Sequence, residues 1–145
     1  MDAADLTGAY TYRSFLDLPD PVDDFNRLRF GQLELRLSAE PDGTLSGLLL
    51  FPAPPGAEPQ RMDITGKVSA EAPLQFHFTG KGRPGTAIAD FHYEYDGTVL
   101  RGWEAGIGQR MTLAGTVLRA ADHGSRAGLA RAGQTASFLA VRRGP

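Results

Sequence analysis

The sequence predicts an all-β fold, most simply an antiparallel up-and-down barrel of about eight strands. Short runs in which apolar and polar residues alternate recur along the whole chain. Gly and Pro, at 18 and 10 of 145 residues, fall between these runs. No stretch of about a dozen residues carries a clean helical stripe. Short links favour antiparallel neighbours, and closure removes both sheet edges, so we expect a closed barrel. A two-sheet sandwich is the alternative.

Length and composition indicate one domain over residues 1–145, with residues 1–7 as a loose tail. A net charge of -2 gives no electrostatic reason to expect nucleic acid or an anionic membrane as a partner. The absence of cysteine excludes disulfides and Cys-based zinc sites. The first residues lack the basic and apolar regions of a signal peptide, and the longest apolar run, Leu48 to Phe51, is too short to span a bilayer. We therefore expect a cytoplasmic protein.

The first half of the chain predicts strands over residues 8–15, 28–37 and 45–51. Residues 16–26 form a Pro- and Asp-rich loop, long enough to cover one open end. The apolar phase changes at Gly31, which predicts a bulge. Residues 40–44, Glu-Pro-Asp-Gly-Thr, predict a tight turn that pairs Leu37 with Gly47. This register leaves Leu48 and Leu50 facing outward, either as a homodimer contact or as half-covered surface leucines.

The second half predicts strands over residues 61–68, 74–79, 109–118 and 135–142, and a hairpin over residues 87–105. Asp96-Gly97 lies between two alternating runs, which is the strongest local signal for a two-residue hairpin loop. One face of this hairpin is apolar and aromatic and includes Phe91, Tyr93 and Tyr95. The other includes Asp90, His92, Glu94, Arg101 and Trp103. The apolar face is the better core, but a binding barrel with a polar interior would reverse this arrangement.

Residues 6–10, Leu-Thr-Gly-Ala-Tyr, resemble the Gly-x-Trp opening of lipocalin- and avidin-type (calycin-like) barrels, with Tyr in place of Trp. In those folds a basic residue of the last strand packs over the opening aromatic, and Arg142 matches that position. The resemblance implies binding of one small hydrophobic or cofactor-like molecule inside the barrel. It does not imply biotin binding, because Trp103 is the only Trp.

Residues 10–15 and 132–141 resemble an uncharacterised bacterial β-barrel module that is also found fused to larger enzymes, including tyrosinase-like proteins. The copper-binding histidines of a tyrosinase have no counterpart here. The resemblance therefore implies no oxidase activity.

The leading functional prediction is binding of a small apolar or aromatic molecule inside the barrel. The predicted wall consists of aromatic side chains: Tyr10, Tyr12, Phe76, Phe78, Phe91, Tyr93 and Trp103. Arg13, Glu104 and Arg110 are the predicted polar anchors. A Glu104 inside the barrel needs a partner such as Arg13, whereas a Glu104 at the rim touches water.

Two alternatives accompany this prediction. A cofactor-free cyclase or isomerase would use Glu104 or His92 for proton transfer. A fully packed barrel would instead serve as an interaction module through Leu48 and Leu50. No cofactor is expected, and no metal, because no motif brings His77 or His123 to His92 with metal-ligand spacing. If their role is only structural, Asp90, His92 and Glu94 form a solvent-exposed strand face that makes charge pairs with the neighbouring strand.

Overall fold

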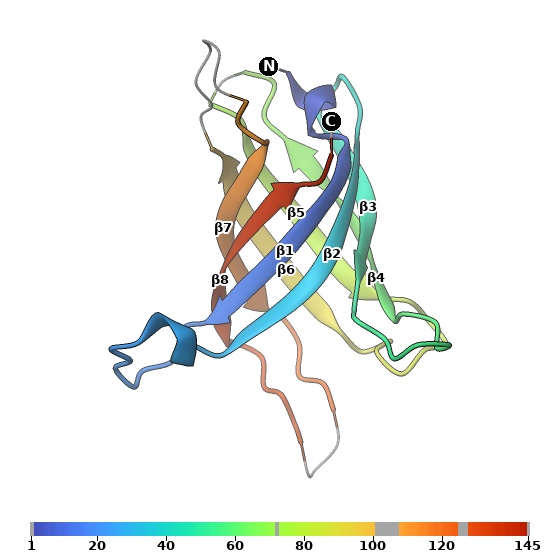
Figure 1. The fold of residues 1–145 in the computed structure, drawn as a ribbon. Coiled ribbons are helices and arrows are strands. Elements are labelled where there is room, and N and C mark those ends of the chain that lie inside the picture. Colours follow the sequence, from blue (N-terminus) through green and yellow to red (C-terminus); the bar gives the residue numbers. More distant parts are fainter. Residues whose placement is uncertain (1, 72, 101–107, 125–127, 145) are drawn as a thin grey trace.

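The chain closes into a barrel in which every strand pairs antiparallel with the next one, and the last pairs with the first (Figure 1). The computed structural model describes residues 2–71, 73–100, 108–124 and 128–144. Its strands are β1 (Gly8–Leu16), β2 (Phe30–Ala39), β3 (Thr44–Leu50), β4 (Arg61–Val68), β5 (Gln75–Gly82), β6 (His92–Val99), β7 (Thr112–Arg119) and β8 (Thr135–Arg142). The predicted up-and-down barrel is confirmed, and the sandwich alternative is not formed.

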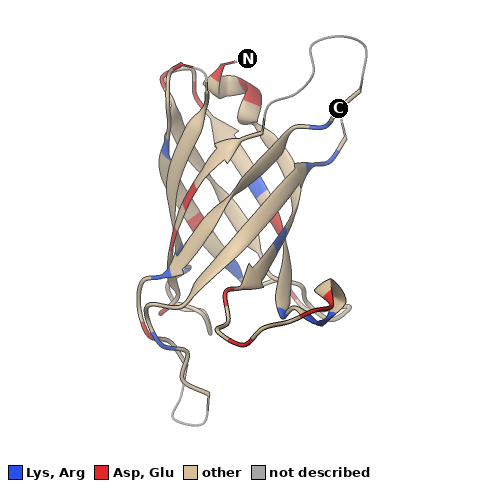
Figure 2. Ribbon diagram, turned by 90° about the vertical axis from the view of Figure 1, so that its left-hand side faces the viewer, with Lys and Arg blue, Asp and Glu red and all other residues tan. Residues whose placement is uncertain are grey.

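Two short 3-10 helices, η1 (Ala3–Leu6) and η2 (Phe25–Arg27), accompany the strands. Within the described residues, no helix is long and apolar enough to cross a membrane. Charged residues of both signs occur on the strands and on the loops at both ends of the barrel (Figure 2).

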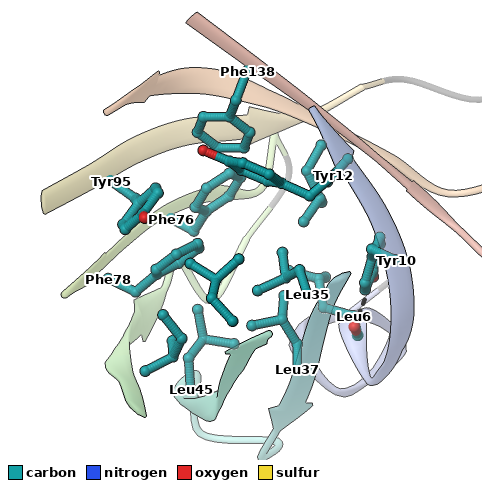
Figure 3. Close-up of a cluster of buried hydrophobic side chains, with 14 of the residues drawn as sticks. Leu6, Tyr10, Tyr12, Leu35, Leu37, Leu45, Phe76, Phe78, Tyr95 and Phe138 are labelled. Carbon is teal, nitrogen blue, oxygen red and sulfur yellow. Dashed lines mark hydrogen bonds between the residues drawn. The ribbon is translucent and has the colours of Figure 1, made fainter. Parts of the chain in front are cut away.

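Aromatic side chains from opposite walls meet in the barrel interior, because alternation turns every second residue of each strand inward. Across the barrel, the ring centroids of Tyr12 and Tyr95 are 6.4 Å apart, and those of Phe76 and Phe138 are 6.2 Å apart. Between neighbouring strands, Phe78 and Tyr95 lie at 4.7 Å, and Tyr12 and Phe138 at 5.3 Å. Phe76 stacks on Phe78 at 5.5 Å. Figure 3 shows these rings gathered on one side of the barrel interior, with Leu6, Leu35, Leu37 and Leu45 beside them.

Helix η1 covers one end of the barrel, so the described residues of the expected loose tail, 2–7, are ordered instead. Leu6 is fully buried, and the Tyr10 hydroxyl donates a hydrogen bond of 2.7 Å to its carbonyl. Arg142 of β8 is the cross-strand partner of Tyr10 and donates to the Asp5 carbonyl at 2.7 Å. The described N-terminal residues are therefore ordered by burial and by hydrogen bonds. Arg142 lies beside the opening aromatic, as the resemblance implied.

The predicted turn at residues 40–44 is confirmed. Gly43 has a φ of 93°, and its N–H donates to the Glu40 carbonyl at 2.9 Å. This turn sets the predicted register, in which Leu37 pairs with Gly47. The predicted bulge at Gly31 is wrong, because the β1–β2 pairing runs through this residue without interruption.

Leu48 and Leu50 lie on the outer wall and are partly buried. Leu48 lies between Arg36 and Asp63 on the neighbouring strands. The homodimer contact through these leucines stays a prediction.

The prediction of a hairpin turn at Asp96-Gly97 is wrong, because both residues lie inside the single strand β6. Gly97 pairs with Phe76 of β5 on one side and with Gly115 of β7 on the other. A Cβ at Gly97 would lie 2.5 Å from Cζ of Phe76 and 2.4 Å from the Ala114 carbonyl oxygen. This glycine is therefore required by the close approach of the β7 backbone and of the Phe76 ring, not by a turn. Residues 101–105, from the second half of the predicted hairpin, lie outside the described residues.

Candidate functional site

The barrel contains a cavity at the end opposite η1, which we call the mouth cavity. Its volume is about 440 Å³. It is bounded by the last residues of β1, the first residues of β2 and inward residues of β4, β6, β7 and β8. Its lining includes Tyr12, Ser14, Arg29, Phe51, Met62, Tyr93, Tyr95, Val117 and Arg119. The interior is thus packed near η1 and hollow toward the other end.

A second hollow, of about 490 Å³, lies beneath the β1–β2 loop. It is lined by loop residues such as Leu18, Val22 and Phe25 and by the outward-facing Phe15 and Ser137. We place the candidate site in the mouth cavity instead, because only the mouth cavity reaches the buried aromatic rings Tyr12 and Tyr95.

Tyr93 holds the centre of a polar cluster on the wall of the mouth cavity. Its hydroxyl lies 2.7 Å from Nε2 of His123 and accepts a hydrogen bond of 3.1 Å from Nε of Arg119. Burial and the Arg119 charge lower the pKa of His123 below its ordinary value. A neutral imidazole with its proton on Nδ1 accepts at Nε2, and in that tautomer the Tyr93 hydroxyl is the hydrogen-bond donor to His123. We call these three residues the mouth triad.

The β7–β8 loop brings His123 to the mouth. His123 pairs with Ala130 across this loop, and its ring stacks on Phe91 with centroids 3.8 Å apart. Phe91 in turn meets Phe51 edge-to-face at 5.8 Å. These ring contacts anchor the loop against the lip of the barrel and fix His123 beside Tyr93.

Neutral phenols form the inner part of the mouth cavity. Burial raises the pKa of Tyr12 and of Tyr95 far above the ordinary value for tyrosine. The Tyr12 hydroxyl has hydrogen-bonding partners in Ser14 and Tyr95. The inner part is thus aromatic with a few satisfied hydroxyl groups, an environment suited to an apolar molecule.

His92 lies on the outer wall, in a row of ion pairs across β5 and β6. Its Nε2 is 2.7 Å from Glu94, whose carboxylate also lies 3.0 Å from Nε2 of His77. Nδ1 of His77 is 2.7 Å from Asp96, and this hydrogen bond is the main reason why the pKa of His77 is raised. The charge pairs expected across the hairpin, to Arg101, lie outside the described residues, and the pairs that the structure shows run to His77 of β5 instead. Among the described residues, no three side chains form a group suited to hold a metal ion.

The aromatic side chains predicted to form the ligand-binding wall lie in two places, the mouth cavity and the packed core. Tyr12 and Tyr93 line the mouth cavity, and Phe91 packs at its lip. Tyr10, Phe76 and Phe78 are buried in the packed interior. Trp103 and Glu104 lie outside the described residues. The ligand-binding roles of all these side chains stay predictions.

The two predicted arginine anchors are misplaced. Arg13 lies on the outer wall, where its guanidinium sits 4.2 Å from the ring centroid of Phe30 and donates to Gln32 at 2.6 Å. It faces outward because its neighbour Tyr12 faces inward. Arg110 is exposed beyond the closed end and donates to the Gly144 carbonyl at 3.0 Å. Neither side chain reaches the barrel interior.

The cationic groups that do line the mouth cavity, Arg29 and Arg119, were missed. The signal for Arg119 was present, because it continues the inward phase of Leu113, Gly115 and Val117. His123 carried no such signal, since its position depends on how the β7–β8 loop folds.

Comparisons of the chain with protein-family models, with curated proteins and with solved structures gave no match. The closed eight-stranded antiparallel barrel is consistent with a calycin-like shape. The barrel interior holds an aromatic cluster. Helix η1 closes the barrel at one end of this cluster, and the mouth cavity adjoins its other end.

Proposed function

We propose that the protein binds a small apolar or aromatic molecule in the mouth cavity. The observation that carries this proposal is the cavity of about 440 Å³ against the buried aromatic cluster. Cavities of roughly 300–1,000 Å³ with mostly apolar linings and a few polar groups are typical of small-molecule sites. The alternative of a fully packed barrel acting as an interaction module would leave no such space.

Filling the cavity tests the proposal without removing a polar group. Val117 is an inward residue of β7 that lines the mouth cavity, and its neighbour Leu118 points outward and is 40% exposed. We expect Val117→Phe to weaken binding of a neutral aromatic probe, naphthamide, by about tenfold or more, because the added ring occupies the ligand's space. Leu118→Phe is the matched control and should leave binding unchanged. Equal affinity of both variants for the probe, measured by calorimetry, would contradict the proposal.

The mouth triad favours a second candidate function, a cofactor-free isomerase. A phenol held between a guanidinium and a neutral imidazole is placed for proton transfer, because His123 takes the Tyr93 proton while Arg119 stabilises the phenolate. The phenolate oxygen would then remove a proton from a substrate carbon next to a carbonyl group. The His123 imidazolium, which holds the proton taken from Tyr93, would protonate the carbonyl oxygen, giving the enol and restoring both Tyr93 and neutral His123. In this candidate function the acid–base groups are Tyr93 and His123, in place of the Glu104 or His92 expected from the sequence.

Phenylpyruvate, an aromatic anion with a slow keto–enol interconversion, is a suitable probe of this second candidate. We expect the protein to accelerate the interconversion and Tyr93→Phe to remove the acceleration while the probe still binds. A wild-type rate equal to that in buffer, measured by the absorbance of the enol under saturating probe, would contradict proton transfer at this site.

A further inference from the structure

We infer that the molecule bound in the mouth cavity is an apolar carboxylic acid, and that Arg119 binds its carboxylate. This inference rests on the proposed function, since it names the class of ligand for the same cavity. It is carried by the charges that line the cavity, by the unpaired state of Arg119 and by the way the Arg119 guanidinium is held.

The mouth cavity is lined by two cationic side chains, Arg29 and Arg119, and by no carboxylate. The remaining lining is aromatic, aliphatic or uncharged. A cavity with one sign of charge and apolar walls concentrates ions of the opposite sign. The lining therefore favours an anion over a neutral molecule or a cation.

Arg119 has no ion pair among the described residues, and unlike Arg13, which also has none but lies on the outer wall, it lines an apolar cavity. Arg36 and Arg143 both pair with Glu34, and Arg83 pairs with Asp63. The hydrogen bonds of Arg119 go instead to the neutral Tyr93 hydroxyl and, at 3.3 Å, to the Arg131 carbonyl. A partly buried cation without a counter-ion is unfavourable, and an anionic ligand would supply the missing charge.

The same two hydrogen bonds orient the guanidinium. They engage Nε and one N–H of Nη1, and they leave the Nη2 donors for a ligand. The ring of Tyr93 lies 5.7 Å from the guanidinium carbon and limits its movement further. A planar guanidinium fixed in this way suits a carboxylate, which accepts charge-assisted hydrogen bonds from it.

The apolar part of the ligand follows from the rest of the lining. Tyr12, Tyr95, Met62 and Val117 face the space next to Arg119. A cavity of about 440 Å³ admits a bicyclic aromatic acid or a medium-chain fatty acid. The acid would place its apolar body against the phenols and its carboxylate at the mouth.

The test compares two probes of nearly the same shape, naphthoate and naphthamide, which differ in charge. We expect the wild-type protein to bind naphthoate about ten- to a hundredfold more tightly, since a charge-assisted hydrogen bond adds roughly that factor. Arg119→Gln should remove this preference. Arg36→Gln, which removes an outer-wall arginine, is the matched control and should keep the preference.

A second measurement needs no variant. Raising the salt concentration to about 1 M screens exposed charges and should weaken naphthoate binding while naphthamide binding stays constant. If Arg119→Gln unfolds, Arg119→Lys replaces it, and a reduced but remaining preference is expected because the charge stays and the planar donor geometry is lost.

The outcomes separate this inference from the proposed function. Equal affinity for the two probes, with binding abolished by Val117→Phe, overturns the carboxylate inference and leaves a neutral-ligand barrel. Failure of both probes to bind overturns the proposed function and the inference together. A preference for naphthoate that survives Arg119→Gln overturns the assignment to Arg119.

Discussion

Gly97 provides the sharpest test of the register of β6, because the structure and the local sequence signal disagree there. We predict that Gly97→Ala lowers the free energy of unfolding by about 1–2 kcal/mol. Alanine in a strand gains roughly 0.5–1 kcal/mol over glycine, and overpacking costs roughly 1–3 kcal/mol. The new Cβ would meet the Ala114 carbonyl oxygen at 2.4 Å and Cζ of Phe76 at 2.5 Å, so both contacts must relax.

Thermal unfolding followed by circular dichroism measures this change. For a chain of 145 residues, the predicted loss lowers Tm by about 3–6 °C. Gly108→Ala is the matched control, because no heavy atom lies within 4 Å of the Cβ it would add. Combining Gly97→Ala with Phe76→Leu should recover part of the loss, with an interaction energy of about 0.5 kcal/mol or more.

Two results would refute this reasoning. If Gly97→Ala behaves like Gly108→Ala, then no ring covers the glycine and the register is wrong. If Gly97→Asn is better tolerated than Gly97→Ala, then the residue occupies the left-handed conformation of a tight turn, which Asn adopts readily.

Three further predictions concern the core and the titratable groups. Phe78→Ala should cost about 3–5 kcal/mol in a urea melt, whereas Phe25→Ala, at a residue 66% exposed, should cost about 0.5 kcal/mol or less. Tyr10→Phe should cost about 1–2 kcal/mol, because a buried backbone carbonyl of η1 loses its donor; no change in Tm would show that the carbonyl finds another. Stability should peak near pH 6.5. Because the pKa of His77 is raised in the folded protein, His77 stabilises the fold at low pH, and this stabilisation is lost as the pH rises above 6.5. Because the pKa of His123 is lowered, the folded protein loses stability as the pH falls below 6.5 and the unfolded chain takes up the proton more readily. The His77 contribution is small because this side chain is exposed, so His77→Gln should flatten only the alkaline limb of the unfolding profile; an unchanged limb would contradict the assignment.

Alternation and turn chemistry were enough to predict the barrel, because both act locally. The Pro-Asp-Gly turn at residues 40–44 needs a left-handed Gly43, and no other part of the chain alters that requirement. Asp96-Gly97 carried an equally strong local signal, yet tertiary packing overrode it. Phe76 needs a neighbour without a side chain, and Asp96 pairs with His77 on β5.

The mouth cavity was only partly predictable for the same reason. Tyr12 and Tyr93 follow from strand phase, and extending the phase of β7 by one step would have added Arg119. Arg13 was placed inside the barrel on its chemistry, although its phase put it on the face opposite Tyr12. The alternation of inward and outward residues along a strand therefore predicts the barrel interior better than the argument that a buried carboxylate needs a cationic partner.

The pairing of β1 with β8 also has a kinetic consequence. These strands come from opposite ends of the chain, and Tyr10 pairs with Arg142. Every other pairing joins neighbours in sequence, so hairpins can form early while this seam must wait for the final strand. Until then β1 exposes an unpaired edge that can pair with another chain. We therefore expect that slow synthesis or loss of β8 favours aggregation over a partly folded monomer, with the closing of this seam as the slowest folding step.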